Sequence, residues 1–85
     1  MRRMRLTVVL YTRPGCGLCD EMKAGVAASA LAGEVELREV DIAGDAHLEE
    51  QYGLRIPVLE HESRVICEGR LDLAALSRAV EGARV

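Results

Sequence analysis

Two cysteines, Cys16 and Cys19, lie three positions apart between an apolar run and a stretch with helical periodicity. Disulfide exchange needs a thiolate, whereas the thiol of a free cysteine is mostly protonated at neutral pH. A helix N-terminus stabilises an anion through its unpaired backbone N–H groups and its dipole. We therefore expect Cys16, at or just before the first helical turn, to be the exposed, acidified nucleophile. Cys19, one turn later on the same face, would resolve the mixed disulfide that Cys16 forms.

Three neighbours of the pair are expected to assist it. Arg13, three residues before Cys16, adds positive charge that favours the thiolate. Gly17 leaves room for a substrate backbone to approach, and Leu18 packs against or lines the edge of the site. These residue types predict a catalytic cysteine pair with a small docking surface around it.

The cysteines also admit other interpretations. A C-x-x-C segment can bind copper(I), zinc or cluster iron, and two cysteines at a helix start can be purely structural. Zinc and clusters usually need four protein ligands, and the chain has no second pair. His47 and His61 lack ligand spacing to the pair and are expected at the surface, so we predict no metal site. Cys67 is expected to be a small core residue, with an accessory thiol as the alternative.

The rest of the chain shows the pattern of a scaffold. Apolar, β-branched runs predict strands, helical spacing predicts helices, and Gly33 is expected to end the first helix. The predicted strands are residues 5–11, 35–42, 54–59 and 64–67, and the predicted helices are residues 17–32, 46–52 and 73 to about 82.

The order β-α-β-α-β-β-α predicts an α/β fold. The first βαβ unit must be parallel and right-handed, and the later hairpin antiparallel. The result is one mixed four-stranded sheet with helices on both faces. Val35 and Leu37 are out of phase with Val40 and Ile42, which indicates a bulge, a late start or burial on both faces.

A proline interrupts the third apolar run. Pro57 cannot donate to a strand ladder, so it is unusual in a strand that otherwise reads as central. The Ile56–Pro57 bond is either trans, which is commoner, or cis, which is rare and usually functional. In the cis form the Ile56 backbone would turn outward and could pair with an extended substrate.

Length and charge exclude several classes of protein. Residues 1–85 make one domain, and the net charge of -3 argues against nucleic acid as a partner. No apolar run approaches the roughly 18 residues of a membrane span, and no signal-peptide cleavage site follows the first apolar stretch. Three cysteines are too few for a secreted disulfide framework. We therefore expect a cytoplasmic protein that does not bind membranes.

The motifs together resemble a known family. Residues 11–19, Tyr-Thr-Arg-Pro-Gly-Cys-Gly-Leu-Cys, resemble the glutaredoxin pattern Tyr-Ser-Lys-x-x-Cys-Pro-Tyr-Cys. Ile56-Pro57-Val58 resembles the Val-Pro segment of that family, and Gly69 with Asp72-Leu73 resembles the end of its Gly-Gly-x-Asp-Asp-Leu motif. Residues 52–57 are similar to a thioredoxin segment. The most similar form is a bacterial glutaredoxin-like family with Cys-x-Leu-Cys.

The resemblance implies a thioredoxin-like, glutaredoxin-type fold with a cis-proline facing the cysteines. It also implies glutathione contacts. Arg13 would meet a carboxylate, the Ile56 backbone would pair with the cysteinyl portion, and Asp72, with backbone N–H groups near Gly69, would hold the γ-glutamyl end.

The chain also departs from the glutaredoxin pattern. Glu68 replaces the first glycine of the Gly-Gly pair and would put negative charge near an anionic tripeptide. Leu71 replaces the first aspartate, and Gly17-Leu18 replace Pro-Tyr.

These observations predict a thiol–disulfide oxidoreductase that reduces protein or glutathione mixed disulfides. We expect no bound cofactor, glutathione as a candidate co-substrate, glutathione or a reductase as electron donor, and a monomer. One alternative is a copper(I) or soft-metal chaperone, although small copper chaperones have the order βαββαβ. Another is a redox-inert interaction module on the same fold.

Overall fold

The computed structural model describes residues 5–83, and its elements follow the predicted order. Among these residues, no helix is long and apolar enough to span a membrane. The strands are β1 (Leu6–Thr12), β2 (Val35–Asp41), β3 (Val58–His61) and β4 (Arg64–Glu68), and the helices are α1 (Gly17–Ala28), a short 3₁₀ turn η1 (Ala32–Glu34), α2 (Ala46–Tyr52) and α3 (Leu73–Ala83).

The four strands form one mixed sheet in the order β2-β1-β3-β4. β1 pairs with β2 in parallel, whereas β3 is antiparallel to both β1 and β4. The β3–β4 hairpin turns through Glu62 and Ser63, whose φ angles are 49° and 67°. Two central residues with positive φ are what a tight two-residue hairpin requires, because that turn matches the twist of the strands. The predicted α/β fold and mixed sheet are confirmed.

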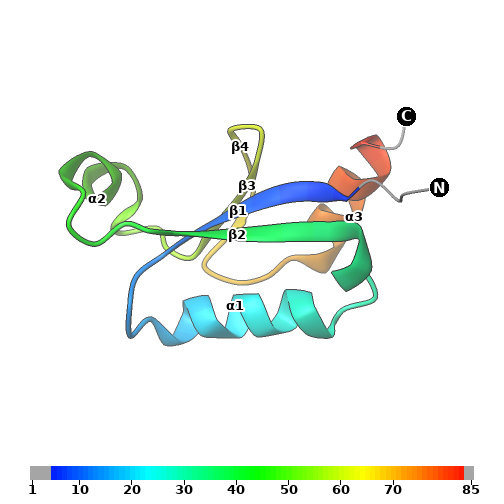
Figure 1. The fold of residues 1–85 in the computed structure, drawn as a ribbon, viewed down its shortest axis with the longest axis horizontal. Coiled ribbons are helices and arrows are strands. Elements are labelled where there is room, and N and C mark those ends of the chain that lie inside the picture. The colour runs from blue at the N-terminus through cyan, green and yellow to red at the C-terminus, as the bar shows by residue number, and fades with distance from the viewer. Residues whose placement is uncertain (1–4, 84–85) are drawn as a thin grey trace.

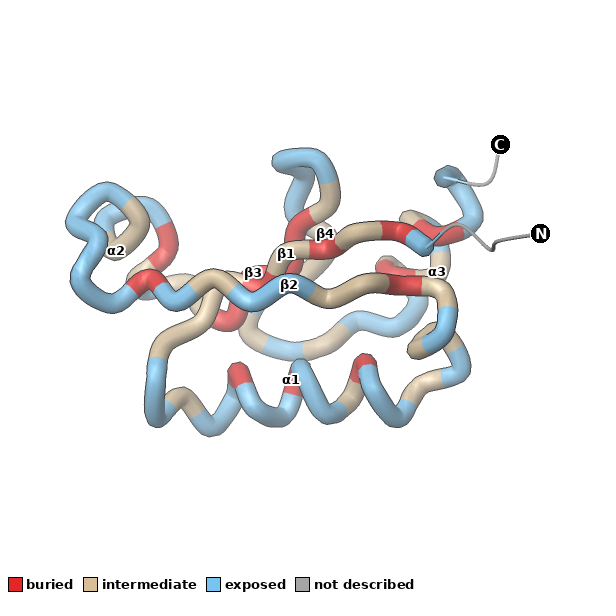
Figure 2. Tube along the Cα trace, in the orientation of Figure 1, coloured by how far each residue is buried: buried red, intermediate tan, exposed pale blue. Residues whose placement is uncertain are grey.

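Helices cover both faces of the sheet. α1 and α3 share one apolar cluster with β1, and α2 packs on the opposite face, near the end of β1. Figure 1 shows α1 lying along the sheet and α2 projecting beyond the strand ends. In Figure 2 the buried (red) segments of α1 lie on the side of the helix that faces the strands. The larger cluster contains Leu6, Val8, Leu10, Met22, Val26, Val35, Leu59, Leu76 and Val80, and the smaller contains Ile42, Tyr52 and Val58.

The two clusters explain the phase change in the second strand. Val35 and Leu37 pack into the α1–α3 side, whereas Ile42 is buried on the α2 side. Successive residues of a strand face opposite sides of the sheet. The apolar positions of a segment that contributes to both cores therefore switch from odd to even numbers along the segment. Of the three explanations, burial on both faces is therefore correct.

Two predicted boundaries were wrong. α1 ends at Ala28, not near Gly33, because the Ser29 hydroxyl donates to the Val26 carbonyl and accepts from the Leu31 N–H. The competition of a serine side chain with the backbone ends the helix early. β3 starts only at Val58, since the N–H groups of the two residues before Pro57 both donate back to the Tyr52 carbonyl in a turn.

Tyr52, at the end of α2, contacts two strands of the sheet. Its hydroxyl donates to the buried Glu60 carboxylate at 2.8 Å, and its ring stacks on Tyr11 with centroids 3.9 Å apart. Burial, together with the Glu60 hydrogen bond, raises the pKa of Tyr52, so the phenol stays a donor. The contact fixes the end of α2, from which the chain enters the loop before Pro57.

Gly69 connects β4 to α3 in a conformation that favours glycine. Its φ is +79°, and its N–H donates to the Pro57 carbonyl at 2.8 Å. The hydrogen bond joins the two loops that precede β3 and α3. Because the left-handed region is costly for a residue with a Cβ, glycine is the natural choice here.

Tyr52→Phe should lower the free energy of unfolding by about 1–3 kcal/mol, since it leaves the buried Glu60 carboxylate without its donor. The ring and its stacking on Tyr11 are retained. Urea unfolding followed by circular dichroism measures the change. The double variant Tyr52→Phe/Glu60→Leu should recover part of the loss, because no buried charge then remains. A single variant as stable as the wild type would contradict this role of Tyr52.

Gly69→Ala should cost about 1 kcal/mol of stability, because alanine disfavours positive φ. A Cβ added at position 69 would meet no atom within 4 Å, so the substitution tests the backbone alone. Gly33→Ala is the matched control, since position 33 has equally open space and no positive φ. Equal unfolding midpoints in urea for the two variants would show that Gly69 is not conformationally required.

Candidate active site

A short turn carries the chain from β1 into the cysteine pair. Gly15 has a φ of +80°, and the Cys16 N–H donates to the Arg13 carbonyl at 3.2 Å. Cys16 is the N-cap of α1, with extended backbone angles. Pro14-Gly15 thus turns the strand sharply enough to place the first cysteine at the positive end of the helix dipole.

The two cysteines differ in exposure. Cys19 lies in the first turn of α1 and is 1% exposed, whereas Cys16 is only half-buried. The Cys19 N–H donates to the Cys16 Sγ at 3.1 Å. The sulfur atoms are joined in a disulfide, with Cα atoms 5.2 Å apart. An external disulfide can therefore reach Cys16 before Cys19, and the helix offers an N–H donor to the Cys16 sulfur.

Arg13 is placed beside the pair but is already engaged. Its guanidinium forms an ion pair and hydrogen bond with Glu49 of α2. The sequence analysis did not identify Glu49, because the two residues are 36 positions apart and nothing local connects them. The positive charge expected to assist Cys16 is thus partly compensated by a fixed carboxylate.

The Ile56–Pro57 bond is cis, as the resemblance implied. The Ile56 backbone was expected to pair with an extended substrate, but its N–H donates to the Tyr52 carbonyl at 3.1 Å. Pairing of this N–H with a substrate strand would therefore require the internal hydrogen bond to open. The Pro57 carbonyl is likewise used, because it accepts from Gly69.

A second ion pair lies beside the same loop. Arg55 donates from Nε and Nη2 to the Glu68 carboxylate at 3.2 and 2.9 Å, and this hydrogen bonding raises the pKa of Arg55. The Arg55 guanidinium also lies 5.5 Å from the centre of the Tyr52 ring. Glu68, which replaces a glycine of the glutaredoxin pattern, therefore has its charge matched by an arginine that the sequence analysis did not single out.

A groove of about 340 Å³ lies between α1 and the loop before α3, and at Leu18 its lining comes within two residues of Cys16 in the sequence. It brings together two of the predicted residues, Leu18 and Gly69. The remaining lining residues, which the sequence analysis missed, are Glu21, Met22, Gly25, Arg70 and Leu71.

Neither cysteine lines this groove, and the predicted residues Arg13, Gly17, Ile56, Pro57 and Asp72 also lie outside it. Asp72 accepts a hydrogen bond from the Ala75 N–H at 3.0 Å and so caps the start of α3. Gly17 is exposed at the first position of α1, and a Cβ there would meet nothing within 4 Å. Gly17 therefore leaves open space next to Cys16, whereas the Asp72 carboxylate is partly committed to the helix.

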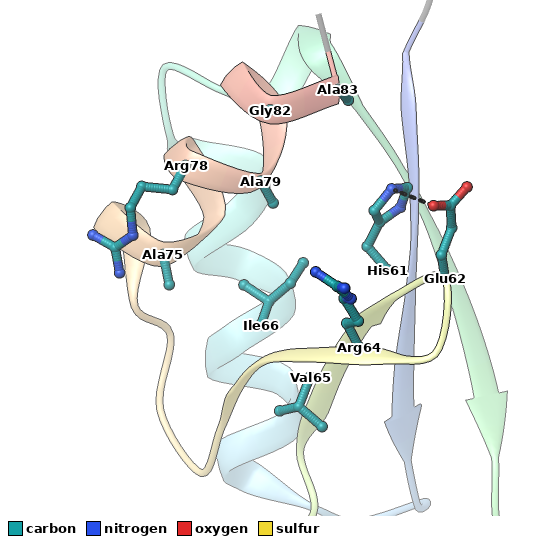
Figure 3. Close-up of a pocket in the computed structure, with 10 residues that line it drawn as sticks. All are labelled: His61, Glu62, Arg64, Val65, Ile66, Ala75, Arg78, Ala79, Gly82 and Ala83. Carbon is teal, nitrogen blue, oxygen red and sulfur yellow. Dashed lines mark ion pairs between the residues drawn. The ribbon is translucent and has the colours of Figure 1, made fainter. Parts of the chain in front are cut away.

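The larger cavity, of about 680 Å³, lies between the β3–β4 hairpin and α3 (Figure 3). Its residues include His61, whose Nδ1 lies 3.0 Å from the Thr7 carbonyl near the start of β1. The cysteine pair follows the other end of β1. None of the residues that line this cavity comes from the segment between β1 and α1 that carries the cysteine pair.

Cys67, the third cysteine, packs against the larger apolar cluster and is half-buried. Burial raises its pKa, so less thiolate is present at neutral pH than for an ordinary cysteine. The position of Cys67 agrees with the predicted core role.

Comparison with known proteins agrees with this geometry. The glutaredoxin-like domain family (DUF836) matches residues 7–81. No curated protein matches the sequence. Protein Ne2328 from Nitrosomonas europaea is 30% identical, with 93% of this chain and 95% of that chain covered and a TM-score of 0.79. Protein XcR50 from X. campestris is 36% identical, with 88% and 96% covered and a TM-score of 0.69.

The fold extends to more distant proteins. A thioredoxin variant from Halobacterium salinarum is 23% identical, with 93% of this chain and 74% of that chain covered and a TM-score of 0.58. This likeness concerns the fold alone. The family match and the two more similar structures lead to the conclusion that the chain belongs to the glutaredoxin-like domain family (DUF836), within the thioredoxin fold.

Proposed function

We propose that this protein is a dithiol–disulfide oxidoreductase in which Cys16 attacks and Cys19 resolves. The observation that carries the proposal is the asymmetry of the pair. Cys16 is accessible at the N-cap and accepts an N–H hydrogen bond, whereas Cys19 is buried one turn behind it. Such an arrangement favours a thiolate on the outer sulfur and reserves the inner one for an intramolecular step.

In the first step the reduced Cys16 thiolate attacks one sulfur of a substrate disulfide. The substrate S–S bond breaks, a mixed disulfide with Cys16 forms, and the leaving sulfur takes the electron pair and then a proton. The Cys19 N–H, 3.1 Å from the Cys16 sulfur in this structure, stabilises the negative charge before the attack.

In the second step the Cys19 thiol loses its proton and attacks the Cys16 sulfur. The mixed disulfide breaks, the second substrate thiol leaves, and the Cys16–Cys19 disulfide forms. Two electrons and two protons have then passed from the dithiol to the substrate. The disulfide present in this structure is the product state of that step.

The oxidised pair must be reduced again by an external thiol. Either glutathione or a dithiol reductase has the required chemistry. We place the protein in the cytoplasm, where such donors keep cysteines reduced and where a chain with three cysteines does not need structural disulfides. No bound cofactor takes part in this cycle.

Cys16→Ser should abolish reduction of a protein disulfide, because serine is not a nucleophile towards sulfur under these conditions. Cys19→Ser should stop the dithiol cycle and accumulate a mixed disulfide on Cys16, detectable by mass spectrometry under non-reducing conditions. Cys67→Ser is the control and should retain at least about half of the wild-type rate, since Cys67 packs against the larger apolar cluster and burial raises its pKa.

The assay follows reduction of a protein disulfide and of a glutathionylated peptide by the reduced protein. Wild-type activity in Cys16→Ser would overturn the assignment of the nucleophile. A mixed disulfide on Cys67 in place of Cys16 would do the same.

A further inference from the structure

We propose, resting on the function above, that the groove beside Cys16 selects polypeptide disulfides with an apolar residue next to the cysteine, and disfavours glutathione. In this proposal the groove determines which disulfides the protein reduces, and Leu18 is the main determinant of that specificity.

The groove offers apolar surface close to the nucleophile. Leu18, two residues after Cys16, is 47% exposed, and the floor is formed by the buried Met22. Leu71 closes the opposite side, where a Cβ on Gly25 would come within 2.8 Å of the Leu71 Cδ2 atom. Because position 25 lacks a side chain, Leu71 can lie against α1 and shape the groove. A single apolar side chain of a substrate would bury the exposed part of Leu18 on docking.

The charges around the site do not favour an anionic tripeptide. Glutathione carries two carboxylates and one ammonium group, so its recognition calls for unpaired cations. Arg13 is paired with Glu49 and Arg55 with Glu68, so each of these cations is matched by an acid. Exposed ion pairs are weak and can open, but the displaced carboxylate would remain beside the ligand.

The groove itself adds no net positive charge. Arg70 lines it, but so does Glu21 on the facing helix. Asp20, exposed in the first turn of α1, adds a further negative charge near the cysteines. A neutral polypeptide segment meets none of this electrostatic opposition.

Internal hydrogen bonds at the site also disfavour glutathione. The Ile56 N–H is bound to Tyr52, and the Asp72 carboxylate caps α3. The Ile56 N–H and one Asp72 carboxylate oxygen, which belong to groups that the glutaredoxin resemblance assigned to glutathione, thus already have partners within the chain. Side-chain burial in the groove requires neither of these hydrogen bonds to break.

The experiment measures second-order rate constants for reduction of three disulfides by the reduced protein. Two are homodimers of the peptides acetyl-Gly-Cys-Leu-Gly-amide and acetyl-Gly-Cys-Ser-Gly-amide, and the third is oxidised glutathione. The wild type should reduce the leucine peptide about fivefold faster than the serine peptide, and about tenfold faster than oxidised glutathione. Equal rates for the two peptides, or oxidised glutathione as the fastest substrate, would overturn the proposal.

Two variants test whether the preference for the leucine peptide depends on the groove. Leu18→Ser should bring the leucine-to-serine ratio close to one, and the ratio is the readout because Leu18 belongs to the cysteine motif itself. Val65→Ser is the matched control, because Val65 is 45% exposed but lines the distant cavity, and its ratio should stay at the wild-type value. A Leu18→Ser variant that keeps the full ratio would show that the groove does not select the substrate.

A third variant tests the electrostatic part. Glu49→Gln removes the acid that faces Arg13 and should raise the rate with oxidised glutathione, relative to the rate with the serine peptide, about threefold. An unchanged ratio of these two rates would contradict the role of charge in disfavouring glutathione. If no disulfide is reduced at all, the proposed function itself fails. If the serine peptide is reduced but the leucine-to-serine ratio is one, only the specificity proposal fails.

Discussion

The hydrogen bond from the Cys19 N–H to the Cys16 sulfur is the interaction on which the rest of the site depends. It exists because α1 begins immediately after Cys16, which leaves the first N–H groups of the helix without backbone partners. The same geometry buries Cys19 one turn later. A single feature, the start of one helix, therefore places an N–H donor at the sulfur of the first cysteine and buries the second.

The sheet holds that helix start in place through two separate cores. The larger apolar cluster packs α1 along β1, and the smaller cluster packs α2 against the end of β1 on the other face. Tyr52 connects α2 to the buried Glu60 and begins the turn that leads to Pro57. The hydrogen bond from the Gly69 N–H to the Pro57 carbonyl then holds the loop before α3 next to the loop before β3. The groove beside the cysteines results from these long-range contacts.

Much of this arrangement could be predicted from local patterns. The cysteine spacing, the alternation of apolar residues and the position of Pro57 lead directly to the fold, because periodicity and turn chemistry are local properties. The ion pairs could not be predicted in this way. Arg13 and Glu49 are far apart in sequence, as are Arg55 and Glu68, and no local rule pairs them. The end of α1 was also missed, since Gly33 is a stronger stop signal than Ser29 until the serine hydrogen bonds are seen.

The most direct test of the central claim is a pH titration of the fully reduced protein, followed by the ultraviolet absorbance of its thiolates. One thiol should ionise well below the ordinary pKa of about 8.5, and this phase should disappear in Cys16→Ser. Cys67 should ionise above the ordinary value, because burial raises its pKa. If all thiols of the wild type ionise at or above the ordinary pKa, the helix start does not activate Cys16 and the account is wrong.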